Sequence, residues 1–189
     1  MSRLGTIRTR GFTLIELMMT IALFGLLIML AIPAGRVYIA NTQVRTASEA
    51  LLNGMQQARA EAVRRNTLVH LILGAGTTWT VGCNTAMGDL DGDGVDDCPD
   101  PIARRAMEEG GTAHTTIAVL PAGANTITFN GLGRVVANED GSASITTFDV
   151  VSATIPFPET RRLRVNVALG GSVKMCDRDM AADDPRACP

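Results

Sequence analysis

The hydrophobic and polar positions divide the chain into three regions, and the first of them is almost entirely apolar. From Phe12 to Ile32 the residues are apolar or small, and Glu16 is the only charged one. About 20 such residues in a helix cross a hydrocarbon core of about 30 Å. The run therefore predicts a transmembrane helix over residues 12–33, preceded by a short basic segment over residues 1–11.

The second region has the periodicity of an amphipathic helix. Beyond Pro33, apolar or small residues recur at steps of three and four, and polar residues occupy the positions between them. We expect the helix to continue unbroken over residues 34–66, with Arg64 and Arg65 in its last turn, where cations interact favourably with the helix dipole. The predicted buried stripe consists of Val37, Ala40, Val44, Ala47, Leu51, Met55, Ala58 and Ala62.

The third region, residues 67–189, has the pattern of an antiparallel β module. Short segments rich in Val, Ile and Thr are separated by Gly, Pro, Asn and Asp. Because the helix stripe needs an apolar cover, we predict an α+β fold in which a long N-terminal helix packs with its second half on an antiparallel β-sheet. The expected strands are residues 67–73, 78–81, 115–120, 125–129, 133–136, 145–151, 161–169 and 172–175.

Length and charge narrow the class of protein. The residues beyond the apolar run suffice for one small domain, and a net charge of −2 gives no general basic excess for nucleic acid. The three arginines of the basic segment, Arg3, Arg8 and Arg10, favour a cytoplasmic N-terminus. The sequence thus predicts a single-pass membrane protein whose C-terminal domain lies outside the cytoplasm.

All four cysteines fall in this C-terminal domain. An even number in an exported, loop-rich domain indicates disulfides, and four cysteines allow three connectivities. We favour the local pairing Cys83–Cys98 and Cys176–Cys188, because each pair encloses a single loop.

Glu16 is unusual, since a carboxylate within a span costs roughly 2.5–3.5 kcal/mol on insertion scales. The run Gly11-Phe12-Thr13-Leu14-Ile15-Glu16, following the basic leader, resembles the processing signature of prepilins. The resemblance implies that a prepilin peptidase cuts between Gly11 and Phe12, that Phe12 becomes N-methylated, and that Glu16 pairs with the amine of a neighbouring subunit. The alternative is a plain single-span anchor that tolerates one acid.

Three further segments resemble the FimT/GspH family of minor pilins and pseudopilins: residues 57–66, 127–134 and 162–167. The tail, residues 176–189, is similar to the FimT branch. The resemblance implies a type IV pilin-like fold and a FimT-like minor pilin that primes filament assembly or lies at the tip. It also implies other pilins as partners, and a location in the inner membrane, with a periplasmic domain, before entry into a filament. The alternatives are a GspH-like pseudopilin of type II secretion and a tip subunit that binds DNA for natural transformation.

An acidic loop over residues 83–100 is a candidate calcium site. Asp89-Leu-Asp91-Gly-Asp93-Gly94 matches the start of an EF-hand-type loop, in which alternating oxygens converge on a hard cation. The alternative is a turn-rich acidic loop closed by a disulfide, since the flanking Gly and Pro residues do not suit helices. The candidate ligands are Asp89, Asp91, Asp93, the carbonyl of Val95, Asp97 and Asp100.

Cations near the C-terminus are candidates for nucleic-acid binding. Some FimT-like pilins carry a Gly-Arg-x-Arg motif for DNA, and the matching positions here read Gly171-Ser172-Val173-Lys174. Lysine contacts phosphate as a point charge without the bidentate fork of arginine. The nearby acids Asp177, Asp179, Asp183 and Asp184 offset this charge. The candidate cations are Lys174, Arg178, Arg186, Arg161, Arg162 and Arg164.

Catalytic motifs are lacking in this sequence. It contains no G-x-S-x-G, H-E-x-x-H or C-x-x-C. We therefore expect a protein that is not an enzyme and that has no cofactor other than the candidate calcium ion.

Overall fold

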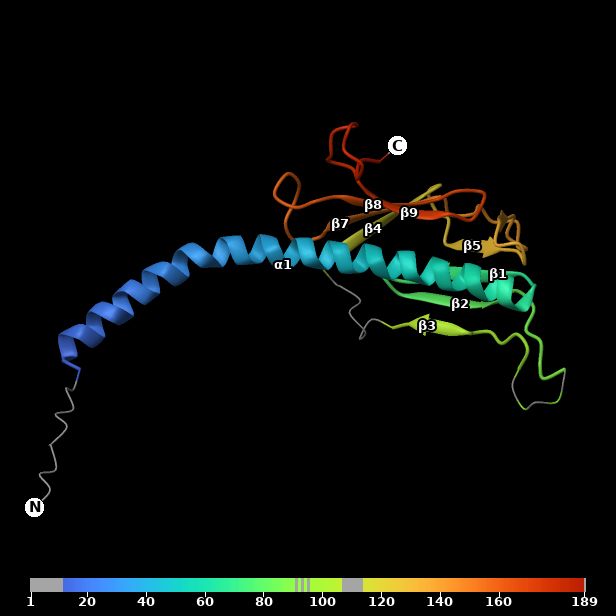
Figure 1. Cartoon of the computed structure of the whole chain (residues 1–189), viewed down its shortest axis with the longest axis horizontal. Helices are drawn as coiled ribbons and strands as arrows, with labels where there is room; N and C mark the ends of the chain where they lie inside the picture. Colours follow the sequence, from blue (N-terminus) through green and yellow to red (C-terminus); the bar gives the residue numbers. More distant parts are fainter. Residues whose placement is uncertain (1–11, 91, 93, 95, 107–113, 189) are drawn as a thin grey trace, which may run out of the picture. The chain divides into compact units, whose positions relative to one another are not determined.

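The computed structural model describes residues 12–90, 92, 94, 96–106 and 114–188. The chain forms two compact units, Met1–Tyr38 and Ile39–Pro189. Helix α1 runs over Leu14–Arg65, and β-strands follow it (Figure 1). The strands are β1 (Val69–Leu73), β2 (Trp79–Cys83), β3 (Ala103–Arg105), β4 (Thr115–Leu120), β5 (Thr126–Phe129), β6 (Val135–Val136), β7 (Thr147–Ser152), β8 (Leu163–Val167) and β9 (Val173–Asp177).

The C-terminal end of α1 agrees with its prediction and has a clear local cause. The helix ends at Arg65 because Asn66 adopts a φ of 50°, in the left-handed region that Asn tolerates. The Thr67 N–H then donates to the carbonyl of Ala62 at 3.2 Å. This bond satisfies one of the carbonyls that a helix end leaves without a partner.

The strands form two antiparallel sheets. The order is β3-β2-β1-β5-β6 in the five-stranded sheet and β4-β7-β8-β9 in the four-stranded sheet. Each predicted strand segment overlaps an observed strand, so the α+β prediction is confirmed. Strand β3 was not predicted, because Ala103–Arg105 carries two arginines and shows no apolar alternation; it pairs with β2 through Trp79↔Arg105.

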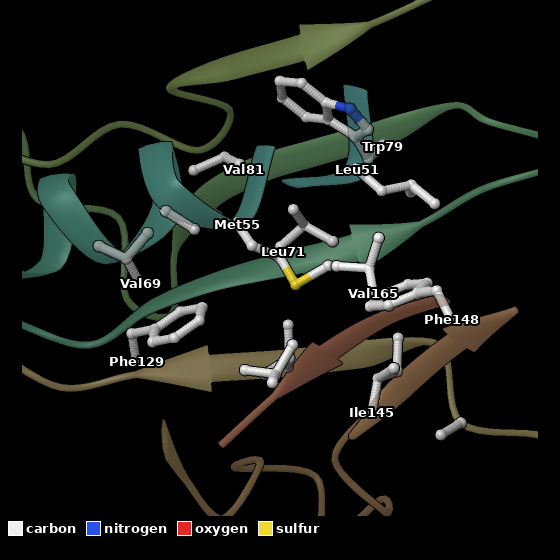
Figure 2. Close-up of a cluster of buried hydrophobic side chains, with 14 of the residues drawn as sticks. Leu51, Met55, Val69, Leu71, Trp79, Val81, Phe129, Ile145, Phe148 and Val165 are labelled. Atoms are coloured by element: carbon white, nitrogen blue, oxygen red, sulfur yellow. The ribbon is translucent and has the colours of Figure 1, made fainter. Parts of the chain in front are cut away.

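The core of the Ile39–Pro189 unit lies between α1 and the sheets. The predicted stripe is confirmed from Ala40 to Ala62, where its residues are at most 3 % exposed. Figure 2 shows Met55 of α1 pointing among Leu71 of β1, Val165 of β8 and neighbouring apolar side chains. In β1 and β7 the buried apolar residues, Val69 and Leu71 in β1 and Phe148 and Val150 in β7, alternate with less buried ones, as a sheet covered on one face requires.

Gly54 permits a close approach of α1 to the five-stranded sheet. A β-carbon on Gly54 would lie 2.8 Å from Cε2 of Trp79 and 3.1 Å from its Nε1. Trp79, the only tryptophan of the chain, is 8 % exposed. The indole therefore packs directly on the helix backbone, as expected of an aromatic residue that anchors the sheet face.

Candidate functional site

The N-terminal motif lies at the start of α1. Gly11 is outside the described residues, so the scissile bond is not defined by the structure. Phe12 is 89 % exposed, and Thr13 is the residue immediately before the helix. Cleavage between Gly11 and Phe12 would therefore leave the new N-terminus two residues from the first helical turn.

Thr13 and Glu16 form a capping box. The backbone N–H and the hydroxyl of Thr13 each donate to Oε2 of Glu16 at 3.3 Å, and the Glu16 N–H donates to Oγ1 of Thr13 at 3.3 Å. Such a box satisfies donors at a helix N-terminus with the side chains of the N-cap and of the third helical residue. In the single chain the lone carboxylate of the apolar segment is thus held by its own helix end.

The apolar side chains of this segment are exposed from Phe12 to Met29. Phe12, Leu14, Phe24 and Met29 range from 66 % to 89 % exposed. Within the described residues, no helix is both long enough and apolar enough to meet the criterion for a membrane span.

The acidic loop is closed by the predicted Cys83–Cys98 disulfide. Asp89 folds back on the loop: its Oδ1 accepts the Gly92 N–H at 2.6 Å, and its Oδ2 accepts the Gly94 N–H at 2.7 Å. Both glycines have φ of at least 80°, which other residues rarely adopt. The N–H groups of these two glycines thus converge on the first candidate ligand.

The other candidate calcium ligands are only partly placed. Asp91, Asp93 and Val95 lie outside the described residues. Asp97 accepts the Leu90 N–H at 2.8 Å. Among the residues that the structure does describe, no group of three or more His, Cys, Asp or Glu side chains is arranged to hold a metal ion.

Asp100 lies against strands β1 and β2. Its Oδ1 is 3.8 Å from Nε2 of His70, and a β-carbon on Gly82 would overlap the same oxygen. His70 and Gly82 are cross-strand partners, so the glycine makes room for the carboxylate beside the imidazole. Asp100 thus holds the segment that follows the disulfide-closed loop against the five-stranded sheet.

Arg65 connects the acidic loop to the end of α1, which the sequence did not indicate. Its Nε donates to Oε2 of Glu61 at 2.9 Å, and its Nη1 donates to the carbonyl of Asp97. The side chain is only 14 % exposed, whereas that of Arg64 is 63 % exposed. Partial burial alone would raise the pKa of Glu61, but the hydrogen bonds from both arginines outweigh it and lower that pKa.

The basic cluster near the C-terminus is largely neutralised by ion pairs. Asp149 of β7 accepts from Arg164 at 2.7 Å and from Arg178 at 3.1 Å. Asp179 accepts from Arg162, whose guanidinium also lies 4.0 Å from the ring centroid of Phe157. The hydrogen bond from Arg164 lowers the pKa of Asp149, against the opposing effect of partial burial.

The tail is held by the predicted Cys176–Cys188 disulfide. Its backbone continues the pairing of β9, since the Asp177 N–H donates to the carbonyl of Arg186 at 2.7 Å. Arg186 in turn pairs with Asp184 at 2.8 Å and lowers the pKa of that carboxyl to about 2. Four of the six candidate DNA-binding cations are therefore paired with carboxylates.

Arg161 and Lys174 are the exposed remainder of the predicted basic patch. Among the described residues, neither side chain forms an ion pair. Lys174 lies on β9 next to Ser172 and Val173, at the position of the second arginine of the family motif. The structure leaves these two cations, and not a cluster of six, available to an anionic partner.

A family model described as type II transport protein GspH matches residues 47–171, well over half of the chain. The chain belongs to the GspH family. A second model, the prokaryotic N-terminal methylation motif, matches residues 7–32. Together they confirm the resemblance seen in the leader, the end of the helix and the strands. A search of curated proteins finds no match.

Comparison with solved structures agrees with this assignment at the level of the fold. The crystal structure of the type IV minor pilin FimU of Pseudomonas aeruginosa matches with a TM-score of 0.52 and 16 % identity, covering 75 % of this chain and 94 % of FimU. A second crystal form of FimU matches with a TM-score of 0.49 and 16 % identity, covering 74 % and 97 %. This GspH-family chain thus shares the minor-pilin fold, a long helix packed on antiparallel sheets.

Proposed function

We propose that this GspH-family chain is a FimT-like minor pilin that assembles into a type IV pilus through its N-terminal helix. The observation that carries the proposal is the exposed apolar surface of α1, in a sequence where Glu16 is the only charged residue from Phe12 to Ile32, upstream of a folded pilin-type domain. So much exposed apolar surface needs a cover, and lipid followed by the helices of other subunits would provide it. The leader is removed by a prepilin peptidase between Gly11 and Phe12, and Phe12 is then N-methylated.

Glu16 has two successive partners in this proposal. In the single chain its carboxylate accepts from Thr13, as the capping box shows. In the filament it pairs with the free amine of a neighbouring processed Phe12. A buried carboxylate is costly in free energy unless it is paired. The ion pair between Glu16 and the amine therefore favours one register between neighbouring helices over the others.

The same domain could serve a type II secretion pseudopilus, and the C-terminal tail favours the pilus. The disulfide Cys176–Cys188 and the pairing of Asp177 with the Arg186 carbonyl fix a short tail of the kind that distinguishes the FimT branch. The geometry favours assembly over nucleic-acid binding, because most of the candidate cations are already engaged by carboxylates.

The test follows processing and incorporation separately. The full-length chain is expressed with and without a prepilin peptidase, and its N-terminus is determined by mass spectrometry. We expect loss of residues 1–11 and gain of one methyl group at Phe12 only with the peptidase. Glu16→Ala should be processed normally but depleted from sheared filaments, while Glu49→Ala, a control acid on the same helix, should incorporate normally.

Two results would contradict the proposal. One is a mature protein that retains Arg10 in the presence of the peptidase. The other is normal incorporation of Glu16→Ala. Deletion of the gene then separates the two machines: loss of surface pili supports the pilus, and accumulation of secreted enzymes in the periplasm supports type II secretion.

A further inference from the structure

Strand β4 forms one edge of the four-stranded sheet, where β7 is its only neighbour among the described strands. The carbonyls of His114 and Leu120 both accept N–H groups from residues that flank β7, at 2.8 Å each. Backbone groups alternate in direction along a strand, so those of Ile117 and Val119 face away from β7. Within the part of the chain that the structure describes, no backbone hydrogen bond is made to these outward groups.

The other sheet edges carry features that discourage pairing with another chain. Strand β3 has three residues, two of them arginines, and β6 has two residues. Strand β9 carries Lys174, and the bridge Asp177↔Ala187 covers its end with the tail. Short edge strands, charged side chains and a covering segment are the usual protections of an edge.

Strand β4 has none of these protections in its own sequence. Its six residues, Thr-Thr-Ile-Ala-Val-Leu, include no charge, proline or glycine. Thr116, Ala118 and Leu120 are exposed, and Ile117 and Val119 are half-buried against the core. An uncharged edge of this length is a template for one more strand.

A second copy of β4 fits this edge better than it would fit the others. A two-fold axis sets a strand antiparallel to itself, so charged residues near the axis would oppose like charges. Arg104 on β3 and Lys174 on β9 would meet this repulsion, whereas β4 is uncharged. An axis at Ala118 places the smallest side chain of β4 opposite itself and brings Ile117 opposite Val119 of the second copy. Both outward-facing residues then find hydrogen-bonding partners, and their side chains extend the apolar layer.

We propose that β4 pairs with β4 of a second copy around a two-fold axis at Ala118, which joins two four-stranded sheets into one continuous sheet. Ile117 of each copy exchanges N–H···O bonds with Val119 of the other. Such an isologous contact closes on itself, so it produces a dimer and does not extend a filament. The inference goes beyond the proposed function, because it concerns the folded domain and not the apolar helix.

Cysteine crosslinking of the full-length protein in detergent micelles tests the pairing. All four native cysteines are in disulfides, so Ala118→Cys adds the only thiol. Directly opposed residues that are not hydrogen-bonded have α-carbons about 4.5 Å apart, which suits a disulfide. We therefore expect a covalent Ala118→Cys dimer under mild oxidation.

Thr116→Cys is the matched control, on the same exposed face of the same strand. In the proposed register Thr116 lies opposite Leu120, so the two copies of Thr116 are about 13 Å apart along the strands. That distance exceeds the reach of a disulfide, and the dimer yield should be roughly tenfold lower than for Ala118→Cys. Mixing Thr116→Cys with a differently tagged Leu120→Cys protein should instead give a covalent heterodimer.

Hydrogen exchange of the wild-type protein provides a readout without an added thiol. Dilution should speed exchange at the amides of Ile117 and Val119 roughly tenfold as the dimer dissociates, while those of Thr116 and Ala118, which face β7, stay protected. Equal crosslinking of Ala118→Cys and Thr116→Cys, or no covalent dimer in protein whose circular dichroism shows it folded, would overturn the inference. Leader processing and filament incorporation are measured on other variants, so failure of this contact leaves the proposed function standing.

Discussion

Replacing Gly54 by alanine sets two opposing effects against each other and so tests the packing of the helix on the sheet. Glycine within a helix is less favourable than alanine by about 1 kcal/mol, so propensity alone predicts that Gly54→Ala stabilises the protein. The new methyl group would, however, lie 2.8 Å from Cε2 and 3.0 Å from Cδ2 of Trp79. The first distance is shorter than real β-carbon contacts allow, and the second is tighter than most of them, so the indole or the helix must shift.

The size of the steric effect follows from how little the indole can move. Trp79 is 8 % exposed and belongs to the buried core. Overpacking of this kind costs about 1–3 kcal/mol. Subtracting the gain in propensity of about 1 kcal/mol, we expect Gly54→Ala to lower the free energy of unfolding by up to about 2 kcal/mol. In a domain of this size each kcal/mol shifts the Tm by about 2–4 °C.

Urea unfolding of the full-length protein in mild detergent measures this change. Trp79 is the only tryptophan, so its fluorescence reports the site directly while circular dichroism reports the fold. Gly54→Ala should shift both transitions to lower urea and change the native emission. The control is Ala60→Gly at an exposed helix position, which should cost about 1 kcal/mol through propensity and leave the emission unchanged.

A variant that lacks the indole separates the steric effect from the effect of helix propensity. In a Trp79→Leu protein the overlap is relieved, so adding Gly54→Ala should be neutral or stabilising by up to about 1 kcal/mol. A rise in stability on Gly54→Ala in the wild-type protein would refute the packing argument.

Three further predictions address the charged groups. Asp149→Asn should lower the free energy of unfolding by about 1–3 kcal/mol, because Arg164 loses a charged hydrogen-bond partner. The folded pKa of Asp149 is lowered from 3.8, so its contribution is complete above the unfolded value and is lost as pH falls through the folded pKa; a pH series of urea midpoints should be flatter below about pH 4 in the variant. Calcium should raise the Tm of the oxidised protein, Asp91→Ala should abolish the increase, and an unchanged Tm would exclude the calcium loop. Binding of DNA at low salt should be weak, and it should decrease in the Lys174→Ala variant but not in the Arg164→Ala variant. Strong, salt-sensitive binding that is lost in both variants would show that the ion pair of Arg164 opens to free its guanidinium for DNA.

The elements that sequence predicts well here are those with a strong local pattern. The stripe from Ala40 to Ala62 is buried as its spacing of three and four requires. Helix termination near Arg65 and the strand segments also follow from composition. Strand β3 could not be predicted, because Ala103–Arg105 forms a strand only by pairing with β2, and its own residues favour no such pairing.

The role of Arg65 shows a second limit of local reasoning. Neighbouring arginines in the last helical turn suggest two equivalent cations near the helix dipole. The structure leaves Arg64 exposed and buries most of Arg65, because the loop carrying Asp97 packs on one side of the helix end. Which side is covered depends on a loop 32 residues away, and no pattern in the helix reveals it.

The C-terminal arginines make the same point for function. The short-range pair Asp184–Arg186 could be anticipated from sequence, and it is present. The partner of Arg164 is Asp149, which lies on the neighbouring strand β7 and is brought opposite by the sheet register. A cation count along the sequence therefore overstates the charge offered to a ligand, because antiparallel pairing places carboxylates among the arginines. Once those pairs are subtracted, the most extensive exposed apolar surface of the described residues is the N-terminal part of α1, which is suited to other protein subunits more than to a nucleic acid.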